Sequence, residues 1–274
     1  AGQKPGLHHF VRKAGAYPAY TFDLNPSERM SAVDVPEQWM QGRTLYGGLS
    51  AALCLEAALR AFPDAPPLRS AQISFVGPAG GAVSMKATML RQGRSVTFIG
   101  ADLFGEKGLA TRAVFCFGAA RESMFDRDFT EAPDAPGVEE SDVFIPEGLG
   151  PSFAQFYDNR LAKGGRPISG VAEHDHYIWV RHRDQKADDI VALLALADMP
   201  PPAMLPMFPQ PAPISSMTWM LNFLTDKPAT EDGWWLMQTR AENAGEGYSS
   251  QDMMVWNAER KLVIAGRQSV AIFI

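Results

Sequence analysis

The sequence predicts an α+β protein built from two similar halves, each an antiparallel sheet wrapped around one central helix. Two observations support this fold class. A short apolar helix followed by a run of alternating strands occurs twice in the chain of 274 residues, and an order of elements that repeats once implies two similar half-domains. Both helices are apolar almost all round, which is typical of helices that are buried on every side.

The first half is expected to span residues 1–125. Its helix, 46–62, begins at two glycines and ends before Pro63. The expected strands are 20–24 before the helix and 69–76, 83–91, 95–104 and 109–117 after it. The separators between these strands are short and rich in glycine, which is typical of hairpins, so we expect successive strands to pair antiparallel.

The second half is expected to span residues 166–274. A strand at 171–183 precedes the second helix, 188–198, which ends before three consecutive prolines. The remaining strands are expected at 214–223, 234–243, 247–256 and 262–273. Between the halves, residues 126–165 lose the alternation and carry scattered prolines and acids, which predicts a crossing linker.

Composition excludes several classes of function. Hydrophobic residues make up 46% of the chain and charged residues 20%, with a net charge of −6, which argues against bulk attraction to nucleic acid or anionic membranes. No apolar run reaches the roughly 18 residues that a membrane-spanning helix needs, and the N-terminus lacks the pattern of a secretory signal. Cys54 and Cys116 lie in apolar segments and are expected as free thiols, which indicates a cytoplasmic protein.

Motifs in both halves resemble those of one family. The first half carries Tyr-Gly-Gly at 46–48, Ile-Ser-Phe-Val-Gly-Pro at 73–78 and Leu-Arg-Gln-Gly-Arg-Ser at 90–95. The second half carries Trp-Val-Arg at 179–181, Leu-Ala-Asp at 196–198, Trp219 and Gln268. This ordered set is similar to the double-hotdog acyl-CoA thioesterase II-like family over most of the chain. The resemblance implies two hotdog halves and an acyl-CoA substrate. Thioester hydrolysis requires water but no metal or organic cofactor.

The resemblance also implies a catalytic group from the second half. The family activates water with an Asp, a Thr or Ser, and a Gln. Asp198 falls on the Asp position and Gln268 on the Gln position. Pro213 falls where the family has its hydroxyl residue, so Ser216, or alternatively Ser215, is expected to take that role, and the third group is a departure from the family pattern.

The residue types fit this chemistry. Asp198 ends a helix, and both the negative end of the helix dipole and burial under a sheet disfavour a charged carboxylate, which raises its pKa toward the range of a general base. The alternative is an acid on a solvated turn. Gln268 shares its parity with Ile264, Gly266, Val270 and Ile272 of the last strand, so it is expected on the apolar face of that strand. A buried amide there can orient a water without competing for its proton. The alternative for Gln268 is an amide that is hydrogen-bonded to the backbone. The alternative for Ser215 and Ser216 is an ordinary position at a strand edge.

Substrate-binding groups are expected in the first half. Gly47 and Gly48 present N–H groups at a helix start, where the dipole favours negative charge and the thioester carbonyl could be polarised. The alternative is that these glycines permit close packing of the helix. Because they belong to the first half, such a site would be composite. Arg94, with Arg69 and Arg91, is a candidate for binding the phosphates of CoA.

Other readings stay open at this point. Residues 23–28 resemble the Asp-x-Asn-Pro-x-His motif of enoyl-CoA hydratases, but Glu28 stands at the His position. A non-catalytic acyl-CoA-binding module follows if the hydroxyl position is lost. His174, His176 and His182 share a strand face, yet no further ligand completes a zinc spacing, so no metal is expected. Exposed sheet edges make a homo-oligomer possible.

Overall fold

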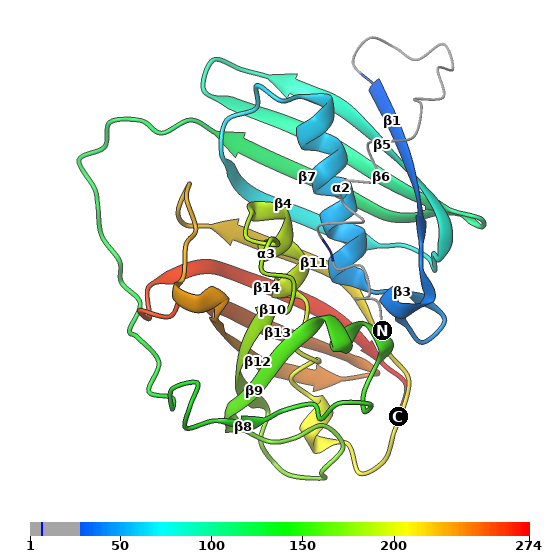
Figure 1. Ribbon diagram of the computed structural model, residues 1–274, viewed down its shortest axis with the longest axis vertical. Coiled ribbons are helices and arrows are strands. Elements are labelled where there is room, and N and C mark those ends of the chain that lie inside the picture. The colour runs from blue at the N-terminus through cyan, green and yellow to red at the C-terminus, as the bar shows by residue number, and fades with distance from the viewer. Residues whose placement is uncertain (1–6, 8–27) are drawn as a thin grey trace.

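A computed structural model describes residue 7 and residues 28–274 (Figure 1). Twelve strands form one sheet in the order β1-β5-β6-β7-β4-β11-β14-β13-β12-β10-β9-β8, and every neighbouring pair is antiparallel. Helices α2 and α3 lie in front of this sheet in Figure 1, one over each half. The strand expected at 20–24 falls outside the described residues.

From its helix onward the first half follows the expected order of elements, whereas β1, which precedes the helix, was not predicted. Its helix and its five long strands are β1 (Glu28–Val35), α2 (Gly47–Ala61), β4 (Leu68–Phe75), β5 (Gly81–Gln92), β6 (Val96–Gly105) and β7 (Gly108–Gly118). A short ribbon precedes α2, made of η1 (Glu37–Trp39), β2 (Met40–Gln41) and β3 (Thr44–Leu45). The buried positions of β6 and β7 alternate, which is the pattern that identified these strands in the sequence.

The second half repeats this order. Its main elements are β10 (Asp175–His182), α3 (Ile190–Ala197), β11 (Ile214–Phe223), β12 (Trp235–Gly245), β13 (Tyr248–Trp256) and β14 (Leu262–Ile272). Two 3₁₀ turns lie in the loops, η3 (Leu205–Met207) and η4 (Glu231–Gly233). Helix α3 is shorter than α2, eight residues against fifteen.

The connection between the halves is not wholly irregular. Residues 126–165, expected as a linker, contain β8 (Asp142–Val143), η2 (Ser152–Phe156) and β9 (Tyr157–Gly164). Strand β9 pairs antiparallel with β10 and extends the sheet of the second half. Its only fully buried side chains are Tyr157 and Asn159, so it lacks the apolar alternation by which a strand is recognised.

The two expected sheets are joined into one. Strand β4 of the first half pairs with β11 of the second, from Thr218 opposite Ser74 to Asn222 opposite Ser70. Each of these strands lies at the edge of its own half of the sheet. An unpaired edge leaves backbone N–H and C=O groups without partners. Pairing edge to edge satisfies these groups, and the result is a continuous sheet rather than two.

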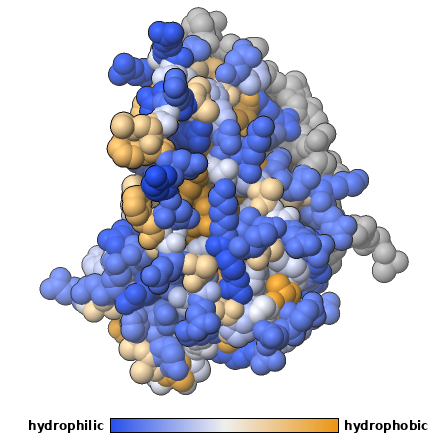
Figure 2. All heavy atoms as spheres, turned by 90° about the vertical axis from the view of Figure 1, so that its left-hand side faces the viewer, coloured by the Kyte–Doolittle hydropathy of each residue, from blue (hydrophilic) through white to orange (hydrophobic). Residues whose placement is uncertain are grey.

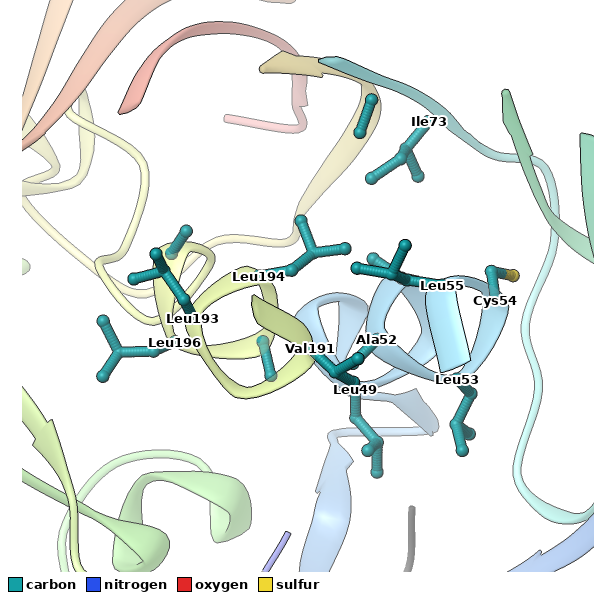
Figure 3. Packing of buried hydrophobic residues seen from close by; sticks show 14 of the residues in the cluster. Leu49, Ala52, Leu53, Cys54, Leu55, Ile73, Val191, Leu193, Leu194 and Leu196 are labelled. Atoms are coloured by element: carbon teal, nitrogen blue, oxygen red, sulfur yellow. The ribbon is translucent and has the colours of Figure 1, made fainter. Parts of the chain in front are cut away.

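Both helices are buried in the core between the sheet and the connecting segments. All residues of α3 from Val191 to Ala197 are buried, as are most of those of α2. In Figure 3, Leu55 of α2 and Leu194 of α3 extend toward Ile73 of β4, the strand at the junction of the halves. Within the described chain neither helix combines the length and apolar character needed to cross a membrane.

The two cysteines are free thiols, as expected from the sequence. Cys54 is buried in α2 and Cys116 is half-buried in β7, and both are free. The face turned to the viewer in Figure 2 is mainly hydrophilic, with apolar side chains in separate groups. Among the exposed apolar residues are Met124, Phe125 and Phe129 at the start of the connection.

Candidate active site

Asp198 occupies the end of α3, as the sequence predicts. It is the C-cap residue of this helix, with φ −93° and ψ 3°. Pro200 follows two positions later, and a proline there prevents the helix from continuing. The first turn of α3 is fixed by Asp189, whose Oδ1 accepts a hydrogen bond of 2.8 Å from the Ala192 N–H.

The carboxylate of Asp198 lies where the two halves meet. Gln268 Nε2 donates to Asp198 Oδ1 over 2.8 Å, and the backbone N–H of Gly48 also donates to this carboxylate. A Cβ added at Gly47 would lie only 2.7 Å from Asp198 Oδ2. The N-terminus of α2 therefore meets the C-terminus of α3, and four residues expected at the site come together from both halves.

Burial raises the pKa of Asp198 to about 7, against the opposing effect of the hydrogen bonds from Gln268 and Gly48. Asp198 keeps some exposed surface, but the protein atoms packed around it make desolvation the larger effect. The sequence predicts a raised pKa partly from the dipole of its own helix. The N-terminus of α2 acts in the opposite sense because it favours negative charge. A carboxylate that titrates near neutral pH is suited to general base catalysis.

Gln268 is held by a second glutamine that the sequence analysis missed. In the sheet, Gln268 lies opposite Trp219 on one side and Gln251 on the other. Gln251 Nε2 donates to Gln268 Oε1 over 2.8 Å, and Gln251 Oε1 accepts from the Ala203 N–H over 2.8 Å. The alternation of β13 carries the signal for Gln251, since the buried residues Ser249, Met253 and Val255 of this strand share its parity.

Gly48 is required by the close approach of the two helices. A Cβ added there would lie 2.3 Å from the Ala195 carbonyl oxygen of α3 and 2.6 Å from the Tyr46 ring. The Tyr46 hydroxyl donates to the same carbonyl oxygen over 2.6 Å, and its ring stacks on Phe153 with centroids 3.9 Å apart. Gly48 thus serves the packing of the two helices as well as any role toward a substrate.

Tyr157 places an unsatisfied hydroxyl near this contact. The side chain is fully buried, and among the residues that the structure describes its hydroxyl has no hydrogen bond of acceptable geometry. Burial is the largest effect on the pKa of Tyr157 and raises it, the neighbouring Tyr46 lowers it, and the charge of Asp198 raises it. A buried polar atom without a partner is uncommon and marks a place for water or a ligand.

The two serine candidates are placed differently. Ser216 lies opposite Val270, two residues along β14 from Gln268, so it belongs to the same face of the sheet as Gln268. Ser215 lies opposite Ala271, is exposed, and its Oγ contacts only the Ser216 carbonyl at 3.5 Å. Within the described chain neither hydroxyl is hydrogen-bonded to Asp198 or Gln268, so the role of Ser216 stays a prediction.

Arg94 is not brought to this site within the chain. It lies in the turn between β5 and β6, and neighbouring Ser95 accepts a hydrogen bond from Ala119. The adjoining Gly118 bonds to Pro67, which follows the C-terminal end of α2. The site is at the opposite end of this helix, and fifteen residues span about 22 Å. A role for Arg94 in binding CoA stays a prediction.

The histidines occupy separate environments. His176 Nε2 lies 2.5 Å from Thr239 Oγ1, and His182 Nε2 lies 2.9 Å from the Ala192 carbonyl oxygen. Both are buried, and burial lowers the pKa of each to about 4. His174 is exposed. No group of three or more possible metal ligands occurs in the part of the chain that is described.

These features define a class of protein and a family. Two similar halves, each with one helix covering its part of a continuous antiparallel sheet, form the double hotdog architecture. The model of the acyl-CoA thioesterase N-terminal domain matches residues 35–118, and that of the C-terminal domain matches residues 127–272. The chain belongs to the acyl-CoA thioesterase family, and it is a thioester hydrolase.

Solved structures share the fold. A protein of unknown function with hotdog fold from Alicyclobacillus acidocaldarius superposes with a TM-score of 0.81 at 24% identity, over 90% of this chain and 94% of that chain. A TesB protein of Mycobacterium avium subsp. paratuberculosis gives 0.72 at 15% identity, over 92% and 94%. The acyl-CoA thioesterase II TesB2 of Mycobacterium marinum gives 0.66 at 19% identity, over 89% and 91%. A search of the curated proteins finds no match.

Proposed function

We propose that this thioesterase hydrolyses a fatty or related acyl-CoA to the free acid and CoA, with Asp198 as the general base that activates water. The observation that carries the proposal is the Asp198 carboxylate, which receives hydrogen bonds from Gln268 and Gly48 and has a pKa of about 7. A base of this pKa is ionised in about half of the molecules at neutral pH and accepts a proton efficiently.

The reaction balances with these groups alone. Ionised Asp198 takes a proton from water as the water oxygen attacks the thioester carbonyl carbon, which forms a C–O bond and an oxyanion. The C–S bond then breaks, and the CoA thiolate leaves and takes the proton from Asp198. Gln268 holds Oδ1, so the attacking water is assigned to Oδ2, beside Gly47, where a side chain would block it.

Of the two glycines, only Gly47 has a backbone N–H that is free to stabilise the oxyanion in this proposal. The Gly48 N–H already donates to Asp198. The Gly47 N–H belongs to the first turn of α2, whose N–H groups have no partner within the helix. We assign the developing negative charge to Gly47, at the positive end of the helix dipole, and the third contact to the water to Ser216.

A second candidate function rests on the same contact. Because Asp198 accepts from the first turn of α2, its carboxylate also caps that helix. A cap stabilises the fold with or without catalysis, so a non-catalytic acyl-CoA-binding module needs no change in this geometry. The hydratase alternative depends on residues 23–27, which lie outside the described residues.

Thiol release from a series of acyl-CoAs tests the proposal. The chain is expected to release CoA from at least one acyl length or head group, and Asp198→Asn is expected to lower kcat by about 10²-fold or more. The matched control is Asp189→Asn, which changes the other carboxylate of α3, keeps a good N-cap residue and is expected to leave kcat unchanged. Saturable binding of a thioether analogue without turnover of any acyl-CoA favours the binding module instead.

Assembly and location extend the proposal. Among the described residues, no further strand pairs with the edge strands β1 and β8 of the sheet. Edge strands with free backbone groups can pair with another chain, and we propose that copies of the chain associate, which sedimentation at several concentrations would test. A cytoplasmic location is proposed from the free thiols of Cys54 and Cys116, because free cysteines persist in reducing compartments.

A further inference from the structure

We infer that Gln251 is a positioning residue that fixes which end of the Gln268 amide faces Asp198. The inference rests on the proposed role of Asp198 as the general base, whose Oδ1 is held by Gln268. Gln251 lies in β13 directly opposite Gln268 in β14 and is 1% exposed. A glutamine buried this completely must have partners for both ends of its amide.

One backbone group sets the direction of both amides. The Ala203 N–H can only donate, so the atom of Gln251 that faces it at 2.8 Å must be its oxygen. Gln251 therefore presents its NH₂ to Gln268, whose oxygen accepts over 2.8 Å. Gln268 in turn presents its NH₂ to Asp198 Oδ1. The orientation follows from the network and not from the similar shapes of an amide oxygen and nitrogen.

The opposite orientation would work against a base. If the Gln268 amide turned by half a rotation, its oxygen would face the Asp198 carboxylate, and two acceptors would oppose each other. That arrangement favours the protonated acid and raises the pKa of Asp198 further. Without Gln251, only the ionised carboxylate of Asp198 itself favours the orientation that keeps the Gln268 NH₂ toward it, and this preference is lost when Asp198 is protonated.

The hydrogen bonds close a ring on a single loop. Asp198 begins the loop after α3 and Ala203 lies five residues further along, so the ring runs from Asp198 through Gln268 and Gln251 back to the loop. The intervening prolines, 200–202, have fixed φ angles. The segment 198–203 is thus tied to β14 at Asp198 and to β13 at Ala203, and Ala203 is itself fully buried.

Gln251→Met tests the inference, because it keeps the length of the side chain and removes the amide. The expected result is a higher pKa for Asp198, so that the acid limb of kcat/KM moves up by about one pH unit, the size expected for a hydrogen bond to a charged group. The pKa of Asp198 is read directly from its carboxyl infrared band, assigned with Asp198→Asn, so this measurement does not need turnover. An unchanged pKa overturns the inference. Loss of turnover in the wild type would overturn the proposed function alone.

A double-mutant cycle separates positioning from independent effects. In the Gln268→Met background, adding Gln251→Met is expected to cause no further shift of the Asp198 pKa, because the residue through which Gln251 acts is gone. Additive shifts overturn the inference. Thr239→Val is the structural control, since it removes a buried hydroxyl bonded to His176 on the neighbouring strand. It is expected to lower Tm without moving the Asp198 pKa, and an equal pKa shift contradicts the inference.

Gln251→Glu provides a second variant should Gln251→Met fold poorly. When the new carboxyl is protonated, its C=O can accept from Ala203 and its O–H can donate to Gln268, so the direction of the ring is kept. When it ionises, it can only accept, and the Gln268 amide must turn. The inference expects an added loss of kcat as pH rises, opposite in sign to the effect of Gln251→Met. A profile with no added limb contradicts it.

Discussion

The two helices of this protein are capped by carboxylates in different ways. In α3, Asp189 stands at the N-cap and binds the Ala192 N–H of its own helix. In α2, Tyr46 stands at the N-cap and makes no capping hydrogen bond with its side chain. The acceptor for the first turn of α2 comes instead from Asp198 in the other half. One end is satisfied locally, and the other is satisfied by the residue proposed to do the chemistry.

The two halves of the sheet also differ in their buried polar residues, and the strand side chain that contacts Asp198 comes from the second half. The inner positions of β13 and β14 carry Gln251 and Gln268, which are joined to each other and to the base. At the inner positions of β7 in the first half, the buried polar residue is Thr111, which bonds only to Ser50 of α2. The two halves thus share one plan, and among the described residues a buried polar network that reaches the base is found in only one of them.

Adding a methyl group to either glycine should break this arrangement in distinct ways. The Cβ of Gly48→Ala meets a backbone oxygen of α3, so the helices must separate, and a loss of about 3 kcal/mol in the free energy of unfolding is expected. The Cβ of Gly47→Ala meets Asp198 Oδ2 and the Phe75 ring, side chains that can move. Here kcat is expected to fall about 10²-fold through displacement of the base.

Urea unfolding and steady-state kinetics on both variants check this prediction. The contrast is the informative part: Gly48→Ala should affect stability more than Gly47→Ala does, and Gly47→Ala should affect kcat at nearly unchanged stability. Equal stability losses would mean that the two glycines serve packing alike and that Gly47 has no special place beside the carboxylate.

The architecture was largely readable from the chain, because each helix and most strands are delimited by glycine or proline and alternate regularly. Three features of the fold were not. Strand β1 (Glu28–Val35) was missed, because the only strand expected before the first helix was 20–24. Strand β9 has too few apolar residues to alternate. The join of β4 to β11 is made by backbone hydrogen bonds between two edges, which no side-chain pattern encodes.

The site was readable to a smaller extent. Asp198 and Gln268 were identified by family resemblance. The position of Asp198 at the end of a helix and the parity of Gln268 in its strand agreed with that identification. The contact of Gly48 with Asp198 could not be predicted, since it depends on how two helices from different halves approach. Tyr157 lies in a segment that the sequence marks as linker. Gln251 was accessible in principle from the alternation of β13, but a lone buried glutamine gives no sign of the partner it will meet.

The pH dependence of stability tests the cost of placing this carboxylate between the halves. Asp198 has a pKa of about 7 when folded and about 3.9 when unfolded. The folded state therefore binds the proton more tightly. Its contribution to stability is complete below about pH 4 and is lost as pH rises to about 7. Relative to Asp198→Asn, the wild type should lose roughly 2 kcal/mol over this range, less than the full shift implies, because Asp198 is partly exposed.

Urea titrations of both proteins between pH 4 and pH 8 measure this difference. Comparing the variant with the wild type removes the opposite contribution of His176 and His182, whose lowered pKa values are common to both proteins. A difference that does not vary with pH would show that Asp198 is ionised throughout this range, which would remove the basis for assigning it as a base near neutral pH.

Tyr46→Phe sharpens the comparison at the helix contact. The change removes the hydroxyl that donates to the Ala195 carbonyl and keeps the ring that stacks on Phe153. A loss of about 1–2 kcal/mol in the free energy of unfolding is expected, since a buried acceptor loses its donor. Because Ala195 precedes Asp198 by one turn, kcat should fall by a few-fold at most. A loss of kcat as large as that of Asp198→Asn would place Tyr46 at the reacting atoms instead.

The smallest effect is expected in the half without the base. Thr111→Val removes the hydroxyl that donates to Ser50 Oγ over 3.1 Å. Ser50 keeps its own hydrogen bond of 2.8 Å to the Gly47 carbonyl, so a loss of only about 0.5–1 kcal/mol is expected. The acid limb of kcat/KM should stay where it is in the wild type. If it moved, the buried polar pair of the first half would be coupled to Asp198 through Gly47, and control of the Asp198 pKa would not be confined to the polar network of the second half.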